Sequence, residues 1–95
     1  MAYIHIAHMG GKTVDFFRSM SSKTAPPAET DGLIAMTAGA YESGVHVLSI
    51  WESKAHLDRF EAEQLFPAFQ AAGVASDIME TTTCTTFAAD DFYIR

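Results

Sequence analysis

The chain contains no asparagine and only one cysteine and one tryptophan among its 95 residues. The lone Cys84 cannot form a disulfide within the chain, which fits a reducing compartment, and we expect a cytoplasmic protein. Basic residues are also few, because 6 lysines and arginines stand against 12 aspartates and glutamates, giving a net charge of −6. No basic stripe offsets this charge, so nucleic acid and anionic membranes are not expected as partners.

Long hydrophobic runs are missing as well. The longest apolar run, LIAMTAGAY, is far shorter than the ~20 residues that a membrane-spanning helix needs. The N-terminal MAYIHIAHMGGK lacks the basic-then-apolar order of a secretion signal. Hydrophobic residues nevertheless make up 48% of the chain, which is typical of a folded protein. The length suits a single domain that spans residues 1–95.

The hydrophobic pattern predicts four strands and two helices. Thr13 is expected to cap a helix that reaches Ser21, and Ser53 a second helix that lasts to Ala72. The resulting order, βαββαβ, is that of an α+β, ferredoxin-like domain, in which both helices cover one face of a four-stranded antiparallel sheet. The expected strands are Ala2–Met9, Leu33–Tyr41, Val45–Trp51 and Ile78–Phe87.

The first three strands are apolar on both pleat faces, whereas a sheet with one face in water alternates apolar and polar residues. Because the helices cover only one face, we expect a second copy to cover the other, giving a homodimer of packed sheets. The alternative is a monomer with an unusually apolar open face. The C-terminal segment is also too apolar for a free end. The expected interface residues are His46, Leu48, Ile50, Phe92, Tyr93 and Ile94.

The second helix has an irregular apolar pattern. At about 100° per residue, the side of Leu57 and Phe60 lies well away from the side of Leu65 and Phe69. Pro67 removes a backbone donor and clashes one turn back, near residue 63. We therefore expect a kink or break there that turns the second half of the helix towards the core.

The stretch IWESKAHLDRFEAEQLFPAFQAAG resembles the antibiotic-biosynthesis-monooxygenase-like proteins of the dimeric α+β barrel superfamily. The shared features are Trp-Glu-Ser at Trp51–Ser53, the aromatic Phe60 nine residues after the tryptophan, and the segment Phe66–Ala68. Gly32-Leu33 and Ala38-Gly39 are also similar to the second strand of that family. The likeness covers Gly32–Gly73 and implies the same fold, a homodimer, and a ligand cavity between the sheet and the helices of each subunit.

The resemblance implies that Trp51 faces this cavity. By pleat parity Val47 and Ser49 share its face, whereas His46, Leu48 and Ile50 point to the dimer interface. The alternative is that Trp51 is a plain core aromatic, and burial alone does not separate the two. The residues expected around a small apolar or aromatic ligand are Trp51, Val47, Ser49, Leu57, Phe60 and Phe16.

Members of the family that oxidise aromatic polyketides use neither metal nor flavin, and the resemblance implies the same absence of cofactors here. It also implies a polar residue four before the tryptophan and an aromatic hydroxyl six after it, but these positions hold Val47 and Leu57. The haem-degrading branch uses an asparagine, which this chain lacks. Cofactor-independent monooxygenation or a related reaction is the favoured hypothesis. The alternatives are a non-catalytic ligand-binding or sensing homodimer, which the apolar Val47 and Leu57 favour, and a structural partner subunit.

Two of the four histidines lie on the first strand. His5 and His8 differ in parity, so they face opposite ways and cannot share a metal ion. The histidine that faces the helices is the candidate general base, because a neutral imidazole accepts a phenol proton near neutral pH. We name His5, although the sequence leaves open which of the two meets the cavity. His56 is expected in solvent, within a charged helix surface formed by Lys54, Asp58, Arg59, Glu61 and Glu63.

Overall fold

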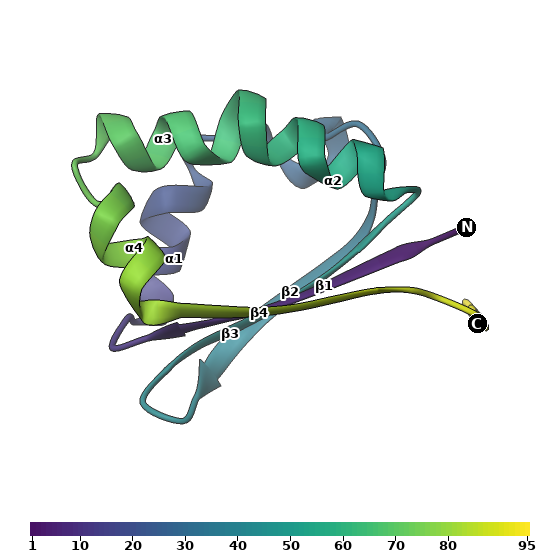
Figure 1. The fold of residues 1–95 in the computed structure, drawn as a ribbon, viewed down its shortest axis with the longest axis horizontal. Helices are drawn as coiled ribbons and strands as arrows, with labels where there is room; N and C mark the ends of the chain where they lie inside the picture. Colours follow the sequence, from purple (N-terminus) through teal and green to yellow (C-terminus); the bar gives the residue numbers. More distant parts are fainter.

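The computed structural model describes residues 1–95. Its centre is a four-stranded antiparallel sheet with the strand order β2-β3-β1-β4. All helices lie on one face of this sheet (Figure 1), which confirms the predicted α+β, ferredoxin-like class. The strands are β1 (Tyr3–Gly10), β2 (Leu33–Tyr41), β3 (Gly44–Trp51) and β4 (Thr82–Ala88).

Both predicted helix starts are confirmed. Helix α1 (Val14–Ser21) follows Thr13, whose side chain accepts a hydrogen bond from the backbone N–H of Phe16 at 3.1 Å. Helix α2 (Lys54–Phe60) follows Ser53, whose hydroxyl accepts the backbone N–H of His56 at 3.3 Å. Each cap satisfies a donor that the first turn of a helix leaves free. A single 3-10 turn, η1 (Pro27–Glu29), lies in the loop before β2.

The long second helix changes its phase through a π-helical segment. Figure 1 shows a continuous helical run from α2 to α3 (Phe66–Ala71), and between them η2 (Glu61–Leu65) is π-helical. The wider π turn takes an extra residue, so the two halves of the helix both turn their apolar sides inwards. Leu57 and Phe69 are accordingly 4% and 8% exposed. The expected re-phasing near residue 63 occurs, but through a π turn ahead of Pro67 rather than a kink or break.

The fourth strand was predicted to start at Ile78, and this boundary is wrong. Residues Ala75–Thr81 form a further helix, α4, and β4 starts only at Thr82. The backbone N–H of Ile78 donates to the carbonyl oxygen of Val74 at 2.9 Å, so the chain is already helical there. Alanine, methionine and glutamate in this segment are good helix formers, whereas the threonine run that follows them forms β4.

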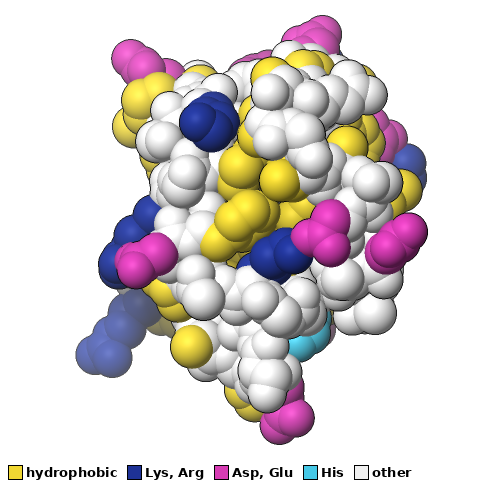
Figure 2. Space-filling view, turned by 90° about the vertical axis from the view of Figure 1, so that its left-hand side faces the viewer, with side chains coloured by type: hydrophobic (Ala, Val, Ile, Leu, Met, Phe, Trp, Pro, Cys, Tyr) yellow, Lys and Arg dark blue, Asp and Glu magenta, His cyan; other side chains and the backbone are white.

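The core occupies the end of the molecule where α1, α3 and α4 meet the sheet. Figure 2 looks at this end and shows hydrophobic side chains gathered at its centre. None of the helices has the length and apolarity needed to cross a bilayer. The buried core cluster comprises Met9, Met20, Val45, Ala68, Phe69 and Ile78.

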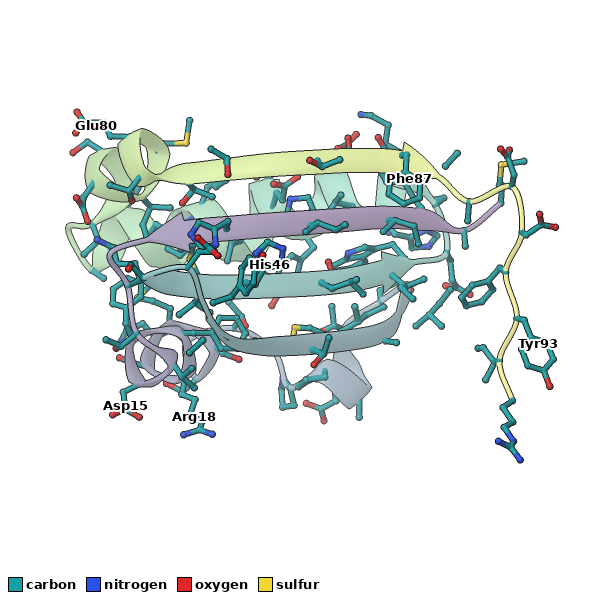
Figure 3. All side chains as sticks on the ribbon, turned by 90° about the horizontal axis from the view of Figure 1, so that it is seen from below. Asp15, Arg18, His46, Glu80, Phe87 and Tyr93 are labelled. Atoms are coloured by element: carbon teal, nitrogen blue, oxygen red, sulfur yellow. The ribbon has the colours of Figure 1, made fainter.

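The opposite face of the sheet carries no helix, and Figure 3 looks onto it. On this face the Nδ1 atoms of His8 and His46 lie 3.2 Å apart in a hydrogen bond, and the ring of Tyr41 meets both imidazoles edge-on. The C-terminal segment runs on past the end of β4, with Tyr93 and Ile94 85% and 66% exposed (Figure 3). The single chain therefore leaves both the sheet face and the apolar tail uncovered.

Candidate functional site

A cavity of about 390 Å³ lies between the sheet and the helical layer. Its wall is mostly hydrophobic and takes side chains from all four strands and from helices along the whole chain. Both the volume and the apolar lining are typical of sites for small molecules. The few polar side chains in this wall therefore decide which ligand the cavity accepts.

Trp51 forms part of the wall at the point where β3 ends. Its side chain is 3% exposed, and its indole Nε1–H donates a 2.9 Å hydrogen bond to the hydroxyl oxygen of Ser49. Its ring packs against that of Phe60, with the centroids 5.2 Å apart and the planes inclined by 40°. A buried indole needs a partner for its N–H, and Ser49 supplies it from the same pleat face. Trp51 is thus held in one orientation.

The structure brings all the sequence-predicted pocket residues to one cavity. Val47, Ser49 and Trp51 contribute from β3, while His46 and Leu48 line a shallow groove on the other face of the sheet. The alternation follows directly from the pleat of β3. From the helical layer, the expected Phe16, Leu57 and Phe60 join the wall.

His5 is the histidine of β1 that faces the cavity, which answers the question that the sequence left open. It lies opposite Ser49 of β3, whereas His8 lies on the outer face against His46. Burial lowers the pKa of His5 from its ordinary value of 6.5, because a buried imidazole is less stable in its charged form. Its imidazole is therefore neutral at pH 7 and able to accept a proton.

Glu61 is one of the wall residues that the sequence analysis missed. It was assigned to the charged helix surface, yet it lines the cavity. It lies four residues after the buried Leu57, and residues four apart share one side of a helix, so the spacing itself was a signal. Burial raises the pKa of its carboxyl, and the nearby charge of Asp58 raises it further, while Lys54 opposes both. Within residues 1–95 the carboxyl makes no ion pair and no hydrogen bond.

Strand β4 adds two more polar groups to the wall. Burial raises the pKa of the Cys84 thiol, with a smaller contribution from the charge of Glu61, so the sulfur stays protonated at neutral pH. This fits the absence of any nucleophile signature around Cys84 in the sequence. The hydroxyl of Thr82, also in the wall, is buried and has no hydrogen-bond partner.

A separate polar group lies outside the cavity, at the start of α2. His56 was expected in solvent, but its side chain is only 27% exposed, and its Nδ1 lies 2.6 Å from the hydroxyl of Ser53. Its Nε2 approaches carboxylate oxygens of Asp31 and Glu52, at 3.9 and 3.8 Å. These three residues are close enough to share a metal ion, although Arg59 already donates to Asp31 Oδ2 at 2.9 Å.

No protein-family model matches the sequence, and no curated protein matches it either. Solved structures do share the fold. Rv0793 from Mycobacterium tuberculosis gives a TM-score of 0.70 at 13% identity, over 97% of this chain and 98% of that one. The NE2512 protein of unknown function from Nitrosomonas europaea gives 0.68 at 13% identity, over 99% and 93%.

A third similar structure has a described activity. SnoaB, a cofactor-independent oxygenase from Streptomyces nogalater, gives a TM-score of 0.60 at 18% identity, over 96% of this chain and 94% of that one. Structural similarity at such low sequence identity shows a shared fold but does not show a shared reaction. The chain shares its α+β fold with these three structures, and this is the fold that the resemblance around Trp51 implied.

Proposed function

We propose that the protein is a homodimer that binds a small apolar or aromatic molecule in the cavity around Trp51 and oxygenates it without a metal or flavin. The observation that carries this proposal is the largely apolar cavity with His5 in its wall. The fold shared with a cofactor-independent oxygenase supports it. Because the single cysteine fits a reducing compartment, the proposal includes a cytoplasmic location.

The proposed reaction begins with the neutral imidazole of His5. It accepts the hydroxyl proton of a phenol or hydroquinone, and the resulting anion passes one electron to dioxygen. The organic radical and superoxide then combine to form a carbon–oxygen bond, and the peroxide anion takes the proton back from the imidazolium of His5. The O–O bond of the resulting hydroperoxide breaks as the hydrogen on the same carbon leaves, which releases water and leaves a carbonyl group. The lowered pKa of His5 keeps the imidazole available as a base at pH 7.

The dimer in this proposal covers the open face of the sheet. Ile6, Leu48 and Ile50 are only half-buried there, and no element of the same chain packs over them. A two-fold pair of such faces buries the apolar side chains of both copies at once. The uncovered C-terminal segment, with Phe92 44% exposed, adds to the same interface.

Ligand binding without turnover is the second candidate function. The oxygenation mechanism forms a negatively charged intermediate, and this wall offers it no lysine, arginine or asparagine. Val47 and Leu57 are apolar where the family resemblance implies polar groups, and Glu61 disfavours an anion. These features favour a sensing or carrier role over catalysis.

Oxygen uptake separates the two candidates. Purified protein is incubated with anthrones and hydroquinones in an oxygen electrode, and binding is followed by the fluorescence of Trp51, the only tryptophan. We expect protein-dependent uptake that His5→Gln removes and that His8→Gln, the same change on the opposite sheet face, leaves intact. Binding without uptake contradicts the oxygenase and favours the second candidate.

A further inference from the structure

Glu61 is a half-buried carboxyl group without a partner. It is the only acidic residue in the cavity wall, and it is neither hydrogen-bonded nor ion-paired within residues 1–95. Buried acidic groups are normally paired, because removing a charge from water costs free energy that only a partner offsets. An unpaired carboxyl that faces an apolar cavity therefore indicates that its partner comes with the ligand.

No lysine or arginine of the chain forms an ion pair with Glu61, although the charge of Lys54 acts on it from a distance. The wall contains neither lysine nor arginine. The ammonium of Lys54, about two turns away along the helix, is held by Asp58 at 2.7 Å. Lys12, at the end of the molecule near Phe16, is paired with Asp77. Both of these cations are therefore engaged by other carboxylates.

Aromatic rings line the same cavity as Glu61. Phe60 directly precedes Glu61 and packs against Trp51, and Phe16 lines the cavity from α1. The faces of such rings attract cations, and tryptophan attracts them most strongly. A carboxylate and aromatic rings in one cavity are a combination that binds an organic ammonium group. The net charge of −6 attracts cations towards the molecule as well.

We propose that the natural ligand carries a positively charged amine on an apolar or aromatic body, and that its ammonium group binds at Glu61. The inference rests on the proposed function of the cavity as a ligand site and names the class of that ligand. A carboxylic acid of the same size would bring two negative charges together in an apolar space. A neutral alcohol would donate one hydrogen bond and leave the charge of Glu61 uncompensated.

Three probes that share one aromatic body test the proposal. These are 2-phenylethylamine, 2-phenylethanol and phenylacetate, with binding measured at pH 7 by calorimetry and by Trp51 fluorescence excited where the probes do not absorb. We expect the amine to bind about tenfold or more tightly than the alcohol, since a charge-assisted hydrogen bond replaces a neutral one. Phenylacetate should bind most weakly. An amine that binds no more tightly than the alcohol overturns the proposal.

Two variants locate the effect. Glu61→Gln keeps the shape of the side chain and removes its charge, so it should lower amine affinity to that of the alcohol and leave alcohol affinity unchanged. Glu63→Gln removes the same charge from an exposed position of the same helical segment and should leave both affinities unchanged. If both variants lose amine affinity equally, the preference for the amine comes from the net negative charge of the protein, and the proposed role of Glu61 is overturned. If no probe binds, the proposed ligand site itself is wrong, whereas equal binding of amine and alcohol refutes only the inference about Glu61.

Discussion

Replacing Leu48 with aspartate tests the proposed dimer most directly. Leu48 lies on β3, on the sheet face that no helix covers, in a shallow groove that also contains His46 and Tyr41. In the single chain its side chain is half-buried among its neighbours in the sheet. A second copy packed on this face would bury the rest of it, and an aspartate there would have no cation to pair with.

The size of the effect follows from burial. Full burial of a leucine side chain contributes about 1.5–3 kcal/mol, and roughly half of this remains for the dimer to gain. A two-fold interface contains the residue twice, so losing the apolar contact alone costs about 1.5–3 kcal/mol of association free energy. Two buried unpaired carboxylates add to that cost. The lost apolar contact alone corresponds to about a tenfold to hundredfold rise in the dissociation constant of the dimer, and we expect the unpaired charges to raise it further.

Sedimentation equilibrium over a concentration series measures this constant, and far-UV circular dichroism reports whether the chain is folded. Ser76→Asp is the matched control, because it adds the same charge at an exposed position in the first turn of α4, where an acid is tolerated. We expect the control to dimerise as the unmodified protein does. A Leu48→Asp variant with an unchanged dissociation constant would show that this face is not the interface.

Three further outcomes are expected. Pro67→Ala should lower the unfolding free energy measured in urea by about 1 kcal/mol, since the restored backbone N–H favours a regular α-helix over the π turn and rotates Phe69 away from the core. A higher unfolding free energy would contradict this. A chain that ends at Asp90 should dimerise more weakly in sedimentation with unchanged circular dichroism, and tight dimers would refute a role for the tail. Glu61→Gln should raise the melting temperature at pH 7 but not below pH 4.5, because a raised carboxyl pKa means that ionisation destabilises the fold as pH rises through it. Equal gains at both pH values would rule out that cause.

Most of the fold could be predicted because its signals are local. Thr13 and Ser53 cap helices through hydrogen bonds to residues three positions on, and the strands show in a few consecutive apolar residues. The start of β4 could not be placed, since Ile78 fits a strand and a helix equally well by hydropathy. Its position is decided by packing against the core, where it is 4% exposed. Packing at Ile78 and the helix-forming residues around it both favour the helix.

Some residues of the site could likewise be predicted from local sequence patterns, and others could not. Pleat parity places Val47 and Ser49 beside Trp51 without any knowledge of the helices. Glu61 was missed because charged residues crowd its helix, and a carboxylate is expected on the outside. Its spacing from Leu57 points inwards, but the π turn that starts at Glu61 has no simple sequence signature. Such turns are frequent at functional sites, which agrees with a role for this residue.

His5 and Glu61 act on different parts of one ligand in these proposals. Burial alone lowers the pKa of His5, whereas the charge of Glu61 contributes to the raised pKa of Cys84 on β4. His5, Glu61 and Cys84 all line the cavity, so a ligand that fills it contacts both His5 and Glu61. His5→Gln should abolish oxygen uptake and its rise with pH through a pKa below 6.5, yet leave amine affinity unchanged. Glu61→Gln should weaken amine binding and keep that pH profile. A loss of both properties in either variant would show that the two residues form one coupled site, and that the base and the amine anchor cannot be assigned separately.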